Sequence, residues 1–413
     1  MTSAKDRSSS LHRRGDCMQR SRMTAASMIV LATCCWTLLG CTQDAAVAEC
    51  VPVSATPPAT SAAIAASLVA IKDKYKLNAI IFSAEQDGMP LLRTALGEST
   101  AGVPATTQMH FRVGGVGWQY LSTVLLRMVE QNPGAIALTD PVAKWYPAYP
   151  NAERTTVRML AASSAGFGDY ITPKSFVADV TADPLRYWSA DDLLARSVLP
   201  YQSPQFDAPG QFWQYSHTDF VMLGAILEKV SGKKYSVLLQ DLVLDPLGLR
   251  DTRLQFDTVP QLPVLHTLAE GDFQDSTYWN PSFVSWAALT SNICDLGAWT
   301  RAFGTGSLLP AGLKGETSAP VNVGLRNMPP DVSPPFVSPQ AYFGLGTIVY
   351  PPWIVQRAAY WGMYTTTAYD PTTGISLSAT ISLSPDSPPD IQPSNDIVTA
   401  ISILLTPGHP VPR

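Results

Sequence analysis

Segments with the alternation typical of β-strands lie near both ends of this 413-residue chain, and segments with helical spacing lie between them. Ala79 to Ser83 and Leu91 to Ala95 flank a turn at 86–90, and residues 358–384 alternate around a turn at 370–374. The strongest helical stripe consists of Leu121, Val124, Leu125, Met128 and Val129. This order predicts one antiparallel sheet completed from both termini, with a helical region inserted, an α/β (α+β) fold.

Further helices are predicted from their end signals. Phe220 to Val230 has helical spacing and is followed by Gly232, a typical C-terminal cap. Residues 189–192 (Ser-Ala-Asp-Asp) form a capping box that opens another helix. We also expect helices at 63–76 and 395–405.

The first 40 residues have the pattern of a bacterial secretion signal. Ala25 to Gly40 is a 16-residue apolar run that follows Arg20 and Arg22, too short to favour a membrane span. It ends in Leu-Leu-Gly-Cys, similar to a lipobox, which predicts that Cys41 is lipidated. An ordinary secretory peptide with an incidental cysteine is the alternative.

Residues 41–62, rich in Ala, Pro, Ser and Thr, are predicted to be a flexible tether to a folded domain at 63–408. The expected location is the cell membrane, with the protein held by its N-terminal lipid on the extracytoplasmic face.

Charge and cysteine content exclude several functions. Six of the 28 basic and two of the 33 acidic residues lie in 1–40, so the rest carries 22 against 31, net −9, which argues against nucleic acid as a partner. After residue 40 the cysteines are Cys41, Cys50 and Cys294. An export compartment would permit a Cys50–Cys294 bridge, but sequence separation does not decide it. No paired Cys or His spacing predicts a metal site, and we expect no cofactor.

Three glycines occur in Phe111 to Trp118 (FRVGGVGW), where an extended segment meets a helical one. A dinucleotide-binding fingerprint would need a third glycine at the position of Tyr120, and a parallel β-α-β unit around it. Neither condition is met, so this interpretation is excluded.

Three stretches together resemble the serine β-lactamase and D-alanyl-D-alanine carboxypeptidase-like family, the branch related to class C β-lactamases. They are residues 111–147, residues 209–252 (PGQFWQYSHTDF onward), and FGLG at 343–346 leading to 360–382. The resemblance covers roughly residues 65–405. It implies the β-lactamase/transpeptidase-like fold, an antiparallel sheet flanked by helices beside a mostly helical lobe, with the active site in the groove between them.

The resemblance also implies where the family's nucleophile should be. Relatives place a serine and a lysine, in S-x-x-K, at the start of the helix after F-R-x-G, and the lysine accepts the serine proton. The corresponding residues here are Gly115 and Trp118, neither of which can perform that chemistry. Where relatives commonly have H-T-S-G, residues 163–166 are Ser-Ser-Ala-Gly.

Two further elements of the family are partly retained. Y-x-N, a proton-relaying tyrosine and an amide-binding asparagine, corresponds to Tyr215 and His217. K/H-x-G, which helps activate the site and bind substrate, corresponds best to Tyr360 and Gly362, without the basic residue. The resemblance therefore implies that Tyr215 is a retained catalytic residue, that Gly115, Trp118 and Tyr360 are degenerate positions, and that His217 and Gly362 remain substrate-binding positions.

The main hypothesis is a cell-envelope lipoprotein that is catalytically inactive and binds a cell-wall peptide or glycan, or an envelope protein. The rival is an active serine hydrolase, a β-lactamase, carboxypeptidase or esterase, with an unorthodox nucleophile such as Ser216. Ser231 to Lys234 also spells S-x-x-K, although Gly232 favours a helix end there. A third hypothesis is a lipid-tethered structural module with a closed groove. Trp118, Trp213 and Trp361 form either an aromatic groove or ordinary core packing.

Overall fold

The computed structural model describes residues 50–198, 208–269, 274–327, 336–389 and 391–412. The predicted signal peptide at 1–40 and the predicted lipidation site Cys41 lie outside these residues. No helix in the described ranges combines the length and apolarity that crossing a membrane requires.

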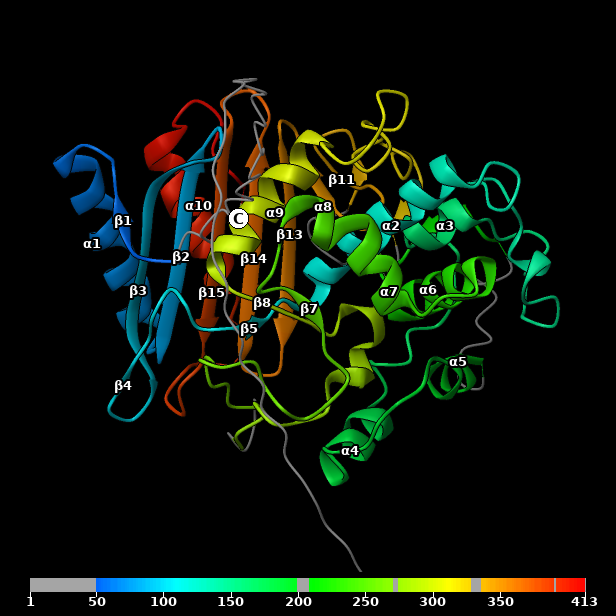
Figure 1. The fold of residues 1–413 in the computed structure, drawn as a ribbon, viewed down its shortest axis with the longest axis horizontal. Helices are drawn as coiled ribbons and strands as arrows, with labels where there is room; N and C mark the ends of the chain where they lie inside the picture. The colour runs from blue at the N-terminus through cyan, green and yellow to red at the C-terminus, as the bar shows by residue number, and fades with distance from the viewer. Residues whose placement is uncertain (1–49, 199–207, 270–273, 328–335, 390, 413) are drawn as a thin grey trace, which may run out of the picture. The chain divides into compact units, whose positions relative to one another are not determined.

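A ten-stranded antiparallel sheet is built from both ends of the chain, as the sequence predicts (Figure 1). Its strand order is β1-β3-β2-β15-β14-β13-β12-β11-β10, with β4 paired to β3. The strands are β1 (Val53–Ser54), β2 (Ala79–Gln86), β3 (Met89–Thr100), β4 (Val103–Pro104), β10 (Val337–Ser338), β11 (Ala341–Phe343), β12 (Ile348–Tyr350), β13 (Trp353–Tyr360), β14 (Met363–Asp370) and β15 (Ile375–Ser382). The N-terminal β2 pairs with the C-terminal β15, which joins the two ends of the chain in one sheet.

Helices cover both faces of this sheet. Figure 1 shows α9 (Ile293–Thr305) in front of the central strands and α10 (Pro393–Leu405) behind them, beside α1 (Pro58–Tyr75). Every residue of β14 and β15 is buried, because each strand is covered on both sides. The three consecutive threonines of β14 are buried too, and two of them bond to neighbouring elements: Thr365 to Thr380 of β15 and Thr366 to Ser394 of α10.

The middle of the chain is mostly helical, as expected. Its α-helices are α2 (Gly117–Gln131), α3 (Val157–Ala161), α4 (Lys174–Ala182), α5 (Ala190–Val198), α6 (His217–Ser231), α7 (Tyr235–Leu239) and α8 (Asp245–Leu247). Helical turns of other types are η1 (Gly114–Val116), η2 (Val142–Lys144), η4 (Gln240–Leu244) and η5 (Pro281–Ala287). The short strands are β5 (Phe111–Arg112), β7 (Arg253–Leu254) and β8 (Leu289–Ser291), which form one small sheet, and the pair β6 (Phe212–Trp213) and β9 (Arg326–Asn327). This class of fold is the one that the sequence predicts.

The folded body begins earlier than residue 63. Residues 50–62, assigned to the tether from their composition, contain β1 and the first turn of α1. Pro58 is the first residue of α1, a position where the missing N–H of proline costs no hydrogen bond. This proline therefore marks the start of a helix and not a tether. At the other end, the buried Val411 donates its N–H to Ser402 of α10, beyond the predicted boundary at 408.

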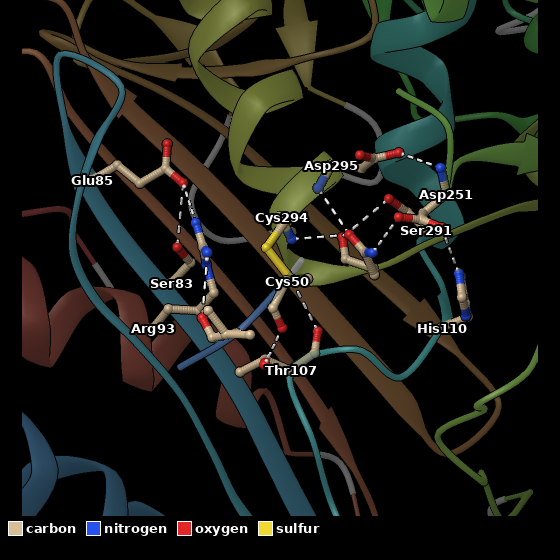
Figure 2. Close-up of a disulfide and its surroundings, with 12 residues drawn as sticks. Cys50, Ser83, Glu85, Arg93, Thr107, His110, Asp251, Ser291, Cys294 and Asp295 are labelled. Carbon is tan, nitrogen blue, oxygen red and sulfur yellow. Dashed lines mark hydrogen bonds and ion pairs between the residues drawn. A yellow bond between two sulfur atoms is a disulfide. The ribbon is translucent and has the colours of Figure 1, made fainter. Parts of the chain in front are cut away.

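A disulfide between Cys50 and Cys294 ties the start of the body to α9 (Figure 2). The two residues are 244 positions apart in sequence, yet their Cα atoms lie 5.7 Å apart. Thr107 donates its hydroxyl to the Cys50 carbonyl at 2.6 Å, which helps to fix the N-terminal segment. The bridge that the sequence left open is therefore present in the structure.

Candidate functional site

The glycine-rich start of α2 packs closely against β13 and η5. A Cβ on Gly114 would lie 3.0 Å from the Ala358 Cβ of β13, and Gly114 has a positive φ of 50°. A Cβ on Gly117 would lie only 2.6 Å from Ala287 Cα in η5. These two glycines are therefore required for close packing of the helix start against the sheet and η5.

Gly115 differs from its neighbours because a side chain would fit there. The nearest atoms to an added Cβ are the Arg357 carbonyl oxygen, the Trp118 indole nitrogen and the Tyr215 hydroxyl, all at 3.5 Å, an ordinary contact distance. A side chain at this position would thus point toward the tyrosine hydroxyl. Packing therefore does not require glycine at 115. As glycine, the residue has no side chain that could carry a reactive group.

Trp118, one helical turn after Gly115, is fully buried in α2. Its ring stacks on Phe220 of α6, with centroids 4.5 Å apart and an interplanar angle of 9°. Its indole N–H donates to the Tyr215 hydroxyl at 2.5 Å. Tryptophan therefore fills the core here and supplies a hydrogen-bond donor, but no amine that could accept a proton.

Tyr215 precedes α6 and remains a neutral phenol near pH 7. Burial raises its pKa well above the ordinary value, and the nearby Asp169 charge raises it further. The hydrogen bond from Trp118 lowers this pKa, but its effect is smaller than that of burial. Tyr215 can donate or accept a hydrogen bond here, but it is not ionised to act as a base.

His217, the first residue of α6, pairs with a carboxylate that the sequence analysis did not identify. Its Nδ1 lies 3.0 Å from Asp169 Oδ2, with side chains 19% and 7% exposed respectively. The imidazole meets the rings of Tyr215 and Trp118 edge-on, at centroid distances of 5.1 and 5.8 Å. We refer to Gly115, Trp118, Tyr215, His217 and Asp169 as the Gly115 cluster.

Ser216 lies between two members of the cluster in the sequence, in an extended conformation directly before α6. Its side chain is buried, and its hydroxyl has no hydrogen-bond partner in the described part of the chain. Its backbone N–H donates to Ser163 Oγ at 2.8 Å. The Ser231 hydroxyl instead donates to the Leu227 carbonyl within the last turn of α6, which ends at Gly232 with a φ of 68°.

Tyr360 and Gly362 lie at a tight hairpin between β13 and β14 rather than in the cluster. Gly362 has a φ of 86°, and a Cβ there would lie 1.6 Å from the Leu268 carbonyl oxygen, so glycine is needed for the turn. The Tyr360 hydroxyl accepts a hydrogen bond from Arg112. Burial raises the pKa of Tyr360 to about 12, against the lowering effect of Arg112. The part of β13 that contacts Gly115 is the Arg357 carbonyl, three residues earlier.

The three tryptophans considered as an aromatic groove stack or pack against different aromatic partners. Trp118 stacks on Phe220, and the buried Trp213 packs against Phe336 and Phe343 at 5.2 and 5.7 Å. Trp361 packs against Trp279 and Phe283 at 4.9 and 4.6 Å. Their main role is therefore core packing. No group of three or more His, Cys, Asp or Glu side chains suited to a metal occurs in the described ranges.

A family model described as Beta-lactamase matches residues 65–396. Among curated proteins, penicillin-binding protein 4* of Bacillus subtilis (strain 168) is 26% identical over 184 residues, which cover 44% of this chain and 39% of the relative. Esterase EstB of Burkholderia gladioli is 28% identical over 210 residues, covering 46% and 52%. The chain thus spans about half of these relatives or less.

Solved structures agree over a larger part of the chain. A D-stereospecific amidohydrolase from Streptomyces sp. has a TM-score of 0.66 and 25% identity, covering 78% of this chain and 94% of that one. The D-amino acid amidase of Ochrobactrum anthropi SV3, complexed with L-phenylalanine, has a TM-score of 0.70 at 19% identity, covering 84% and 99%. The second likeness shows the fold alone.

Proposed function

We propose that this chain, which belongs to the β-lactamase family, is a catalytically inactive member. It binds a ligand in the Gly115 cluster without forming an acyl-enzyme. The observation that carries this proposal is the surroundings of Gly115. A side chain would fit and would face the Tyr215 hydroxyl, yet none is present.

The remaining groups of the cluster do not supply the missing nucleophile. Covalent catalysis needs a nucleophile next to a group that takes up its proton. The Trp118 N–H is a donor only and is already bonded to Tyr215. Tyr215 stays protonated, because burial raises its pKa. The rival function, hydrolysis through Ser216, is disfavoured because the Ser216 side chain is buried and therefore closed to a substrate.

The ligand that we propose is a cell-wall peptide or glycan, or alternatively an envelope protein. The names of the similar proteins include a penicillin-binding protein, an esterase and a D-stereospecific amidohydrolase, so amide- and ester-bearing molecules are the first compounds to test. We propose no cofactor and no nucleic-acid partner, and a membrane contact through the N-terminal lipid only.

The proposed location is the extracytoplasmic face of the cell membrane, with Cys41 as the lipid anchor. The Cys50–Cys294 disulfide supports export, because disulfides persist in oxidising compartments and are rare in the cytosol. The short apolar segment before Cys41 supports the same conclusion from the sequence.

Hydrolysis of nitrocefin and p-nitrophenyl acetate by the purified protein tests the loss of activity. The matched control is Gly115→Ala, whose methyl group fits but cannot react. We expect the wild-type protein and the control to give the same rate as buffer. A wild-type rate above buffer that the alanine variant abolishes would show an active site at this position and refute the proposal.

A further inference from the structure

The imidazole of His217 is oriented by a single carboxylate. Asp169 Oδ2 lies 3.0 Å from Nδ1, and Asp169 is nearly buried, so the carboxylate holds the proton of the neutral ring on Nδ1. The other ring nitrogen, Nε2, is then a hydrogen-bond acceptor. The position where relatives have an asparagine amide, which can both donate and accept, presents an acceptor only.

This acceptor is available to a ligand. Trp118, Tyr170 and Tyr215 surround the imidazole edge-on, at centroid distances of 5.8, 6.2 and 5.1 Å. The side chain nevertheless remains 19% exposed. In the part of the chain that the structure describes, only Asp169 bonds to the ring, and it bonds through Nδ1.

The titratable groups around His217 include two carboxyls. Asp169 comes from the loop after α3, and Asp219 lies on α6 itself. Burial raises the pKa of Asp219 well above its usual range, which disfavours a second negative charge beside Asp169. Burial also raises the pKa values of Tyr170 and Tyr215, which remain phenols. A ligand carboxylate at Nε2 of the neutral ring would therefore face a hydrogen-bond acceptor and the nearby Asp169 carboxylate, and both disfavour its binding.

We propose that His217 selects the ligand of the Gly115 cluster by accepting an N–H, so that this site prefers an uncharged carboxamide to a carboxylate. The inference rests on the proposed function, reversible binding at this cluster.

Three small probes of similar shape test the inference: benzamide, N,N-dimethylbenzamide and benzoate. Their binding to the full-length protein is measured by ligand-observed NMR titration at about pH 8. We expect benzamide to bind about tenfold more tightly than its dimethyl derivative, which has no N–H to donate. Benzoate, which also has no N–H, should bind more weakly than benzamide.

Two variants assign the effect to this histidine. His217→Phe keeps a ring at this position but has no acceptor nitrogen, so its preference for benzamide over the dimethyl derivative should be lost. The matched control is His266→Phe, because His266 also pairs with a carboxylate, Asp275, at 3.1 Å, with a side chain 23% exposed. The control variant should behave like the wild-type protein.

Equal binding of the two amides by the wild-type protein, or an unchanged preference in His217→Phe, overturns the inference and leaves reversible binding in place. No binding of any probe by the wild-type protein also overturns it. A covalent adduct with a penicillin refutes the proposed function independently of these results.

Discussion

The indole N–H of Trp118 donates a hydrogen bond to the Tyr215 hydroxyl at 2.5 Å. In the family's S-x-x-K pattern this position belongs to the lysine that activates the serine. Here α2 also contacts the tyrosine, through an indole N–H that donates a hydrogen bond but cannot accept a proton. The stacking of Trp118 on Phe220 adds buried aromatic contact between α2 and α6.

Trp118→Phe should destabilise the protein by about 1 kcal/mol more than Trp213→Phe, as measured by urea unfolding. Both substitutions remove the same atoms from a buried position. The Trp213 indole N–H has no hydrogen-bond partner among the described residues, so only the first substitution also breaks a hydrogen bond. Equal losses in the two variants would contradict a stabilising role for the Trp118–Tyr215 bond.

The double variant Gly115→Ser with Trp118→Lys should regain little hydrolysis. Serine fits at 115, whereas lysine at 118 gives up a buried indole, at a cost of about 3 kcal/mol or more, and places an ammonium among aromatic rings. Catalytic groups that act as a unit are strongly non-additive, and His217 and Tyr360 still differ from the family pattern.

We expect at most acylation of this double variant by a penicillin, without turnover. A nitrocefin hydrolysis assay would detect any turnover. Gly115→Ser alone is the control for folding. Turnover at a rate typical of active relatives would show that the rest of the catalytic site is intact.

Much of the fold follows from local patterns in the sequence. The stripe from Leu121 lies within α2, and Gly232 ends α6 in the left-handed conformation, as its position predicts. The capping box also forms, because Ser189 Oγ accepts the Asp192 N–H and Asp192 accepts the Ser189 N–H. Such signals are local, so a single sequence reveals them.

Features that depend on distant contacts could not be predicted. Cys50 and Cys294 meet only because β1 joins the sheet edge and α9 crosses the sheet. Asp169 lies 48 residues before His217, and no motif connects the two. Only Gly362 matches the family's K/H-x-G pattern by its letter, and whether Tyr360 lies in the strand or at the hairpin depends on the register of β13 with β14, which their pairing sets.

Removal of the disulfide by Cys50→Ser with Cys294→Ser should destabilise the protein by about 2–5 kcal/mol, because the bridge closes a long loop and restricts the unfolded chain. Thermal unfolding with and without a reductant provides the measurement. Reductant should lower the melting temperature of the wild-type protein and leave that of the double variant unchanged. A wild-type melting temperature that reductant does not affect would contradict a stabilising bridge.

Cys41→Ala should move the protein from the membrane fraction to the soluble fraction of cells. The acyl chains on Cys41 are the only stable anchor that we propose, and lipid anchors of this kind hold a protein through buried methylene groups. Salt-washed membranes probed by immunoblot give the readout, with Cys50→Ala as the control. A Cys41→Ala variant that still sediments with washed membranes would contradict lipidation as the anchor.

Intact mass after incubation with a fluorescent penicillin and, separately, a fluorophosphonate tests the central claim most directly. Gly115 has no hydroxyl to acylate and Trp118 has no amine to activate one, so the wild-type protein should keep its mass with both reagents. Gly115→Ser, run in parallel, shows whether a hydroxyl at this position can be reached. A stoichiometric adduct on any serine of the wild-type protein would contradict the account, and an adduct on Ser216 would establish hydrolysis through an unorthodox nucleophile.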